Sequence, residues 1–298
     1  MALKILKYAA IDIGSNATRL IITNIIEQAN QKSQFKKVSL VRVPIRLGSD
    51  VFFKDKISTE NRERMTQALI AYKLLMDVHK VEKFKACATS AMREAENGEE
   101  VADYIFKKSG IKIDIIDGKT EASIIASTDL KQYIDKDKNY LYVDVGGGST
   151  EFSLFKNGNI CQSKSFPIGT VRQLGDNVSK ETWQDVENWI KTNTKNLSQL
   201  NLIGSGGNIN KIFKMSGKKL GRPMSYLYLN SQYHLYNNMT YEERISKLEL
   251  NPDRADVIIP ALKIYLLAMK WSKARNIYVP KIGLADGIIK SLYTGTLK

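Results

Sequence analysis

The chain has 298 residues, of which 43% are hydrophobic and 26% charged, a balance typical of a soluble globular protein large enough for two domains. No apolar run approaches the roughly 18 residues of a membrane helix, and two cysteines, Cys87 and Cys161, argue against a disulfide framework. No signal-peptide pattern precedes the strand that begins the sequence, so we expect a cytoplasmic protein without a membrane partner.

The charge is strongly basic, with 45 lysines and arginines against 31 acidic residues. Such a field attracts polyanions, although a basic composition can also serve solubility alone. Zinc-finger spacing, a basic zipper region and an RNP motif are all missing from the sequence, so nucleic acid is not an expected partner. Lysines gather at 211–222, which suggests either a solvated loop or a path for a long anionic chain.

The first half of the chain reads as strands followed by alternating helices and strands. A hairpin over 10–22 and a strand over 38–46 precede a turn at 47–50 and a helix capped by Ser58 or Thr59. The remaining expected elements are a strand at 84–88, a helix at 101–108, a strand at 111–116 and a helix from about Thr120 to about Tyr133.

The second half restarts the same order at Tyr140. Its expected elements are a hairpin, a strand at 161–166, a helix at 181–200, a strand at 202–203, helices at 209–215, 241–248 and 257–272, a strand at 277–279 and a helix at 285–293; 216–232 reads as irregular. We therefore predict two similarly built α/β domains, 1–125 and 126–284, with the helix in 285–298 packing back on the first.

The two hairpins are altered copies of one sequence. Residues 10–22 align without a gap on 142–154, matching Asp12 with Asp144, Gly14 with Gly146 and Thr18 with Thr150. The spacing is too long for a solenoid and suits a duplicated domain. One position differs in charge, because Arg19 in the first copy aligns with Glu151 in the second.

Each hairpin turn offers several backbone N–H groups to an anion. The candidate phosphate-binding residues are Gly14, Ser15 and Asn16 in the first turn and Gly146, Gly147, Gly148 and Ser149 in the second. A tight hairpin also needs glycine for conformational reasons, so either turn alone is a weak signal. Gly206 and Gly207, before the helix at 209–215, add a further candidate anion site.

An aspartate precedes each turn, and carboxylates beside phosphates are commonly compensated by Mg²⁺ or another divalent cation. Asp12 and Asp144 are therefore candidate metal-associated residues, although solvated or turn-capping aspartates give the same pattern. Arg19 and Arg93 are candidates for binding phosphate oxygens bidentately. For Arg93, an ordinary surface helix residue is the alternative.

Glu121 is the candidate catalytic carboxylate, because it lies in the first turn of a helix where the dipole favours its ionised form. Helix capping is the competing explanation. Glu151 is the second candidate, and two carboxylates around one water suit phosphoanhydride hydrolysis. Neither histidine lies near a motif and neither cysteine has a base partner, so thiol and zinc chemistry are not expected.

Four motifs together resemble the exopolyphosphatase/guanosine pentaphosphate phosphatase (Ppx/GppA) family, over residues 8–289: Asp12–Asn16, Ala88–Ala95, Asp144–Glu151 and Arg254–Ile258. The resemblance implies two actin-like ATPase (ribonuclease H-like) α/β domains with the active site in the cleft between them, and Mg²⁺-dependent release of terminal phosphate. It places catalysis on Glu121 and Glu151, the metal on Asp144, and phosphate contacts on Arg93, Gly146, Gly147, Gly148 and Ser149. A homodimer is a possible implication.

The sequence departs from the family pattern at Thr120, where many members carry an acidic residue, and it ends at Lys298 without the extra helical domains of long members. We therefore expect a preference for short polyphosphate. Hydrolysis of guanosine pentaphosphate is the alternative in the same enzyme class. An actin-like nucleotide-binding scaffold with slow ATPase activity is the alternative from another class, and the two glutamates argue against it.

Overall fold

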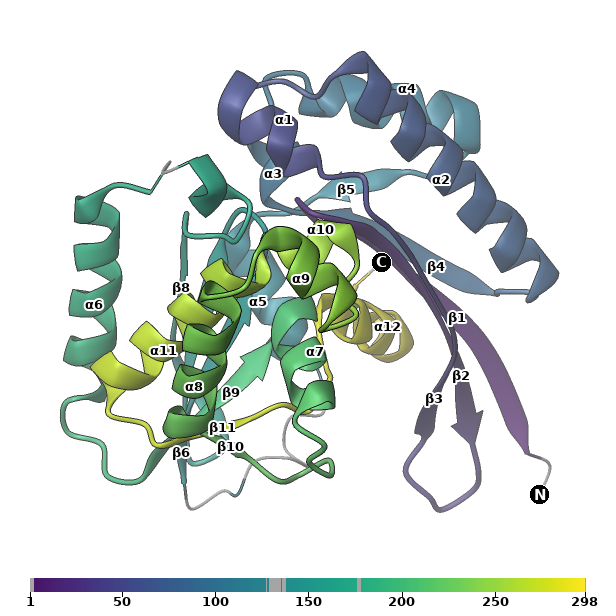
Figure 1. Cartoon of the computed structure of the whole chain (residues 1–298). Coiled ribbons are helices and arrows are strands. Elements are labelled where there is room, and N and C mark those ends of the chain that lie inside the picture. Colours follow the sequence, from purple (N-terminus) through teal and green to yellow (C-terminus); the bar gives the residue numbers. More distant parts are fainter. Residues whose placement is uncertain (1–2, 127, 129–134, 136–137, 176–177, 298) are drawn as a thin grey trace. The chain divides into compact units, whose positions relative to one another are not determined.

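The computed structural model describes residues 3–126, 128, 135, 138–175 and 178–297. They fall into two compact units, of which unit 1 comprises Met1–Thr128 with Leu284–Lys298 and unit 2 comprises Asp129–Gly283. Figure 1 shows each unit as a twisted sheet with helices packed on it. Among the described helices, none is both long and apolar enough to cross a membrane.

Unit 1 has a five-stranded sheet in the order β3-β2-β1-β4-β5, in which β1, β2 and β3 are antiparallel and β4 and β5 run parallel to β1. Its elements are β1 (Lys4–Ile13), β2 (Thr18–Glu27), β3 (Gln34–Val43), α1 (Leu47–Lys54), α2 (Thr59–Val78), β4 (Lys83–Ala88), α3 (Ser90–Glu94), α4 (Gly98–Ser109), β5 (Ile113–Ile115), α5 (Gly118–Ala126) and α12 (Leu284–Thr294).

Unit 2 has a six-stranded sheet in the order β10-β11-β9-β6-β7-β8. Its elements are β6 (Asn139–Val145), β7 (Thr150–Lys156), β8 (Asn159–Phe166), a 3₁₀ turn (Arg172–Gly175), α6 (Lys180–Thr194), β9 (Leu200–Ser205), α7 (Gly207–Met215), β10 (Met224–Ser225), α8 (Tyr226–Asn237), α9 (Tyr241–Ser246), α10 (Pro252–Ala255), α11 (Ile258–Ser272) and β11 (Asn276–Tyr278).

The two sheets share one topology. In each, an antiparallel three-stranded meander (β1-β2-β3 or β6-β7-β8) is extended from its first strand by parallel strands, β4 and β5 or β9 and β11. The predicted pair of similarly built α/β domains is therefore confirmed. The last six residues of β1 are all buried, as expected for a strand covered on both faces.

Two local predictions were wrong. The expected turn at 47–50 is the start of α1, because Leu47 and Val51 are buried and the Gly48 N–H donates to the Ser15 carbonyl at 2.8 Å. The expected irregular stretch at 216–232 contains the start of α8, which buries only Leu229 and Tyr236 and so gives a weak helical pattern.

The helix predicted from Thr120 is α5, which starts at Gly118. Its predicted continuation to Tyr133 lies outside the described residues. Helix α12, which follows unit 2 in the chain, packs on α5, β1 and β4 of unit 1 (Figure 1). The helices α5 and α12 approach so closely that a Cβ on Gly287 would lie 2.2 Å from the Ile124 carbonyl oxygen.

We predict that Gly287→Ala destabilises the protein by about 1–3 kcal/mol, because the added methyl group must push α12 away from α5. Thermal or urea unfolding measures the effect. Thr294→Ala, at an exposed position of the same helix, is the control and leaves stability within about 0.5 kcal/mol of wild type. Equal stability of Gly287→Ala and the control would disprove the close contact.

Candidate active site

The first candidate turn, residues 14–17, joins β1 to β2 at the edge of unit 1 where the parallel strands β1, β4 and β5 end. Ligands of open α/β sheets bind at this carboxyl edge. The Gly14 N–H closes the turn on the Ala17 carbonyl at 3.1 Å, and the Ser15 hydroxyl bonds the Ser90 hydroxyl at 3.0 Å. The turn is thereby fixed to the segment that follows β4.

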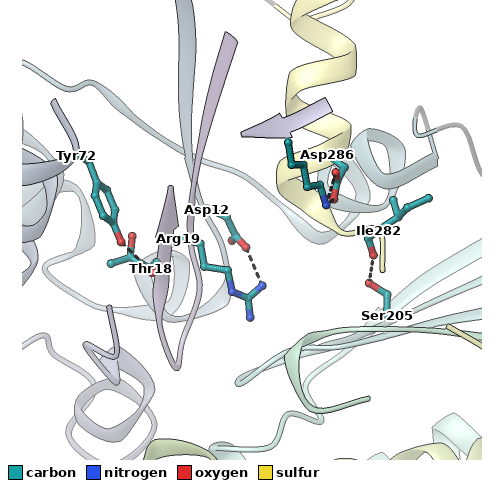
Figure 2. Close-up of polar contacts among 8 residues, drawn as sticks. Asp12, Thr18, Arg19, Tyr72, Ser205, Ile282 and Asp286 are labelled. Carbon is teal, nitrogen blue, oxygen red and sulfur yellow. Dashed lines mark hydrogen bonds and ion pairs between the residues drawn. The ribbon is translucent and has the colours of Figure 1, made fainter. Parts of the chain in front are cut away.

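Asp12 and Arg19 face each other in register across β1 and β2. An Arg19 guanidinium nitrogen lies 3.4 Å from Asp12 Oδ2, an ion pair drawn in Figure 2. Burial raises the pKa of the Asp12 carboxyl, and the positive charge of Arg19 acts in the opposite direction. Asp12 thus already has a cationic partner, while the Arg19 side chain stays one-third exposed.

Glu121 lies in the first turn of α5 and is only 8% exposed. The N-terminal cap of this helix is a different residue, because the Asp117 carboxylate accepts the Thr120 N–H at 2.7 Å. Hydrogen bonds from the side chain and then the backbone of Thr120 lower the pKa of Asp117. Capping therefore does not account for a buried glutamate at position 121.

Arg93 follows β4 in α3, and its guanidinium donates to the Ile116 carbonyl at 2.7 Å, immediately after β5.

Burial raises the pKa of the Cys87 thiol to about 12, and the charges of Asp12 and Glu121 act in the same direction. Both carboxylates therefore lie within electrostatic range of one thiol. Unit 1 thus gathers Asp12, Arg93, Glu121 and turn 14–17 at one sheet edge.

The second candidate turn, residues 146–149, joins β6 to β7 at the corresponding edge of unit 2. Its carbonyl oxygens are occupied by the segment after β8: the Gly146 carbonyl accepts from Thr170 N at 3.0 Å, and the Gly147 carbonyl accepts from Val171 N at 2.8 Å. The Arg172 guanidinium donates to the Gly148 carbonyl at 2.9 Å.

The N–H groups of this turn are in the opposite situation. Within the described part of the chain, those of Gly147 and Gly148 have no protein acceptor. A turn whose carbonyls are bonded and whose N–H groups are available is suited to bind an anion. Turn 146–149 therefore has the polarity that anion binding requires.

The close approach of the two segments depends on a glycine that sequence reasoning missed. A Cβ on Gly169 would lie 2.2 Å from the Gly147 carbonyl oxygen and 2.4 Å from the Gly148 carbonyl carbon. Unit 1 uses the same device, since Arg46 N donates to the Asn16 carbonyl at 3.0 Å and Gly48 N to that of Ser15. In both units the chain returns after its third strand to hold the turn.

Glu151 faces Asp144 in register and is 2% exposed. Its Oε1 accepts hydrogen bonds from the Ser149 hydroxyl at 2.7 Å and the Ser165 hydroxyl at 2.9 Å. The Ser149 side chain, predicted to bind phosphate, is thus engaged in orienting Glu151. Ser165, on β8, was not predicted, because only strand register brings it to this carboxylate.

The loop between β9 and α7 lies beside Asp144, which pairs in register with Ser205. Gly206 has φ 116°, a conformation that favours glycine, and a Cβ there would lie 2.7 Å from the Val145 carbonyl oxygen. The Tyr265 hydroxyl donates to the Ser205 carbonyl, and the Ser205 hydroxyl donates to the Ile282 carbonyl at 2.9 Å (Figure 2). These bonds fix Gly206 and Gly207 at the start of α7.

The donor set for a metal differs between the two aspartates. The described residues contain no cluster of three or more histidine, cysteine, aspartate or glutamate side chains that could hold an ion alone. Mg²⁺ needs only one or two carboxylates when substrate phosphates and water supply the remaining oxygens. Half-buried Asp144, beside turn 146–149, fits this role, and Asp12 forms an ion pair with Arg19.

A family model described as the Ppx/GppA phosphatase family matches residues 24–294. The chain belongs to the Ppx/GppA phosphatase family. The resemblance seen in the four motifs is therefore confirmed, and so is the assignment to a family of phosphohydrolases.

Named relatives of this Ppx/GppA member differ in how much of their length it covers. The bifunctional 3-dehydroquinate synthase/phosphatase of Fusobacterium nucleatum is 32% identical over 282 residues, which span 84% of this chain but only 41% of that protein. A putative exopolyphosphatase of Haemophilus influenzae is 24% identical over 318 residues, spanning 95% of this chain and 90% of the relative.

The crystal structure of an exopolyphosphatase from Cytophaga hutchinsonii superposes with a TM-score of 0.83 at 23% identity, covering 97% of this chain and 98% of the other. At this identity the likeness establishes the two-domain Ppx/GppA fold.

We predict that Gly169→Ala raises the KM for phosphate substrates about tenfold or more and lowers stability by about 1–3 kcal/mol, because the methyl group displaces turn 146–149. Steady-state kinetics and thermal unfolding measure the two effects. Gly283→Ala, where the backbone is not left-handed and a Cβ would meet only the Ser205 hydroxyl at 3.9 Å, is the control for the glycine change itself. An unchanged KM would show that the return segment does not set the turn.

Ser165→Ala is expected to lower kcat about tenfold with little change in KM, because it removes one of two hydrogen bonds to a charged carboxylate. Ser163→Ala is the matched control on the same strand, since Ser163 bonds Ser153 and not Glu151. Phosphate release by the two variants, measured side by side, tests the role of Ser165. Equal rates of phosphate release would show that Ser165 has no such role.

Proposed function

We propose that the chain is a Mg²⁺-dependent exopolyphosphatase that releases terminal phosphate from inorganic polyphosphate. The observation that carries this proposal is the polarity of turn 146–149, whose carbonyls are bonded by the protein while the N–H groups of Gly147 and Gly148 are available. Phosphate oxygens are the acceptors that such a turn binds best. A preference for short chains, expected from the family resemblance, is part of the proposal.

In this proposal the arginines and the glutamates have different roles toward the substrate. Arg19 and Arg93 offset the negative charge of the phosphates. Glu121, buried in the first turn of α5, accepts a hydrogen bond from the attacking water and directs it at the terminal phosphorus, in line with the bridging oxygen of the shortened polyphosphate chain that leaves. Glu151, held by Ser149 and Ser165, is the second carboxylate acting on this water.

A divalent cation bound with the substrate would supply further charge neutralisation. Asp144 would hold it, directly or through water, beside the phosphates bound by turn 146–149. Gly206 and Gly207 precede the N-terminus of α7, whose N–H groups and dipole suit one more phosphate.

We predict that Glu121→Gln lowers kcat about 10²- to 10⁴-fold, because the amide cannot accept the proton of the attacking water, while KM changes little. Phosphate release is measured with Mg²⁺ from tripolyphosphate, long-chain polyphosphate, guanosine pentaphosphate and ATP. Glu100→Gln is the matched control, since Glu100 is an exposed carboxylate in the first turn of α4 in the same unit.

Each substrate tests a different function of the candidate site. Turnover of polyphosphate that depends on Glu121 supports the proposal, and turnover of guanosine pentaphosphate alone supports the alternative phosphatase. Hydrolysis of ATP alone favours an actin-like nucleotide-binding scaffold. Wild-type rates for Glu121→Gln on every substrate would show that Glu121 is not catalytic.

A further inference from the structure

Unit 2 contains a hollow of about 770 Å³ at the edge of its sheet where β6, β9 and β11 begin. The ends of α6 and α11 complete its lining, and in Figure 1 these segments meet at the lower edge of the unit. Turn 146–149 and Gly206 follow the other ends of β6 and β9. The hollow and the candidate active site therefore lie roughly 20 Å apart along β6, at opposite edges of one sheet.

The lining of this hollow is strongly basic. It contains no acidic side chain and six cationic ones: Lys138, Lys191, Lys195, Lys270, Lys273 and Arg275. Two of them have carboxylate partners, Asp135 for Lys138 at 3.0 Å and Glu187 for Lys191 at 2.5 Å. For the other four, the described residues provide no carboxylate within ion-pairing distance. Their mutual repulsion would be relieved by a bound anion.

Helix dipoles explain part of this charge. Lys191 and Lys195 lie at the end of α6 and Lys270 and Lys273 at the end of α11, where cations are favourable. Arg275 lies two residues beyond the C-cap of α11 and just before β11. Helix dipoles also do not explain why the ends of α6 and α11 meet at one concave surface. By bringing several positive charges together, this arrangement suits a multiply charged anion.

We propose that this basic hollow binds an internal segment of a polyphosphate chain whose terminal phosphates occupy the candidate active site. Lysine ammonium groups bind phosphate oxygens as point charges and suit a flexible, sequence-free polyanion. This inference rests on the proposed function for the nature of the chain. It adds a second attachment point that is separate from the chemistry.

Single-stranded nucleic acid fits this surface less well. Proteins that bind it stack successive bases on exposed aromatic side chains. The one aromatic side chain in the lining, Trp271, is half-buried and packs against Trp183 with ring centroids 6.3 Å apart. The remaining polar lining is amide and hydroxyl, which serves phosphate oxygens without a base.

A second attachment point affects substrates according to their length. Tripolyphosphate is far shorter than the separation between the hollow and the site, so only a long chain can occupy both. Occupying both lowers the dissociation constant of long chains without changing the chemical step. The hollow therefore acts against the preference for short chains that the family resemblance implies.

The test compares Lys195→Gln/Lys270→Gln with a control double variant, Lys54→Gln/Lys107→Gln, which removes two exposed lysines from helix ends in unit 1. Binding of fluorescently labelled long-chain polyphosphate to the full chain is measured over a salt series with divalent cations chelated. We expect the hollow variant to bind about tenfold more weakly and to reduce the slope of log Kd against log salt by about 1 to 2, whereas the control matches wild type.

Turnover of tripolyphosphate is measured on the same proteins and is expected to be unchanged, since neither lysine belongs to the active site. Equal binding by the hollow and control variants would overturn the proposal, as would a loss of tripolyphosphate turnover in the hollow variant. Tighter, lysine-dependent binding of single-stranded RNA would assign the hollow to nucleic acid instead. Lysine-dependent polyphosphate binding without any turnover would refute the proposed function, but it would support polyphosphate binding by the hollow.

Discussion

The candidate site depends on one constraint, namely that a turn offering its N–H groups to a substrate must have its carbonyl oxygens satisfied elsewhere. In turn 146–149 the backbone of 170–172 and the Arg172 guanidinium supply the missing donors. A free carbonyl beside a phosphate would be repulsive, so these bonds do more than hold the loop in place. Because the carbonyl oxygens are bonded to the return segment, they are kept from repelling a bound phosphate.

The same constraint explains what the duplication preserved. Both units send the chain back to the turn directly after the third strand, through Arg46 and Gly48 in unit 1 and through 170–172 in unit 2. What the duplication changed is the charge opposite each aspartate. Asp12 faces Arg19 and is paired with it, whereas Asp144 faces Glu151, whose charge is held by two serine hydroxyls. One copy therefore pairs its aspartate with a cation, and the other places two carboxylates opposite each other.

Part of this could be predicted from the sequence, because the repeat alignment matched Asp12 with Asp144 and Arg19 with Glu151. The pairing of Asp12 with Arg19, and of Asp144 with Glu151, was not predicted, because it depends on the strand register within each hairpin. The donors that complete the site could not be found in this way. Gly169 and Ser165 act through contacts between strands and return segments, and the basic hollow assembles lysines from segments far apart in the chain. Likewise, only the fold shows that Asp117, and not Glu121, caps α5.

The position of α12 has a consequence for biosynthesis. Unit 2 is inserted into unit 1 between α5 and α12, and the helix that carries Glu121 packs against α12. A ribosome therefore completes all of unit 2 before the packing partner of the Glu121 helix leaves the exit tunnel. The sheet of unit 1 can pair its strands earlier, but its candidate catalytic helix gains its partner last. A nascent chain would thus form both candidate turns before its candidate catalytic helix is held in place.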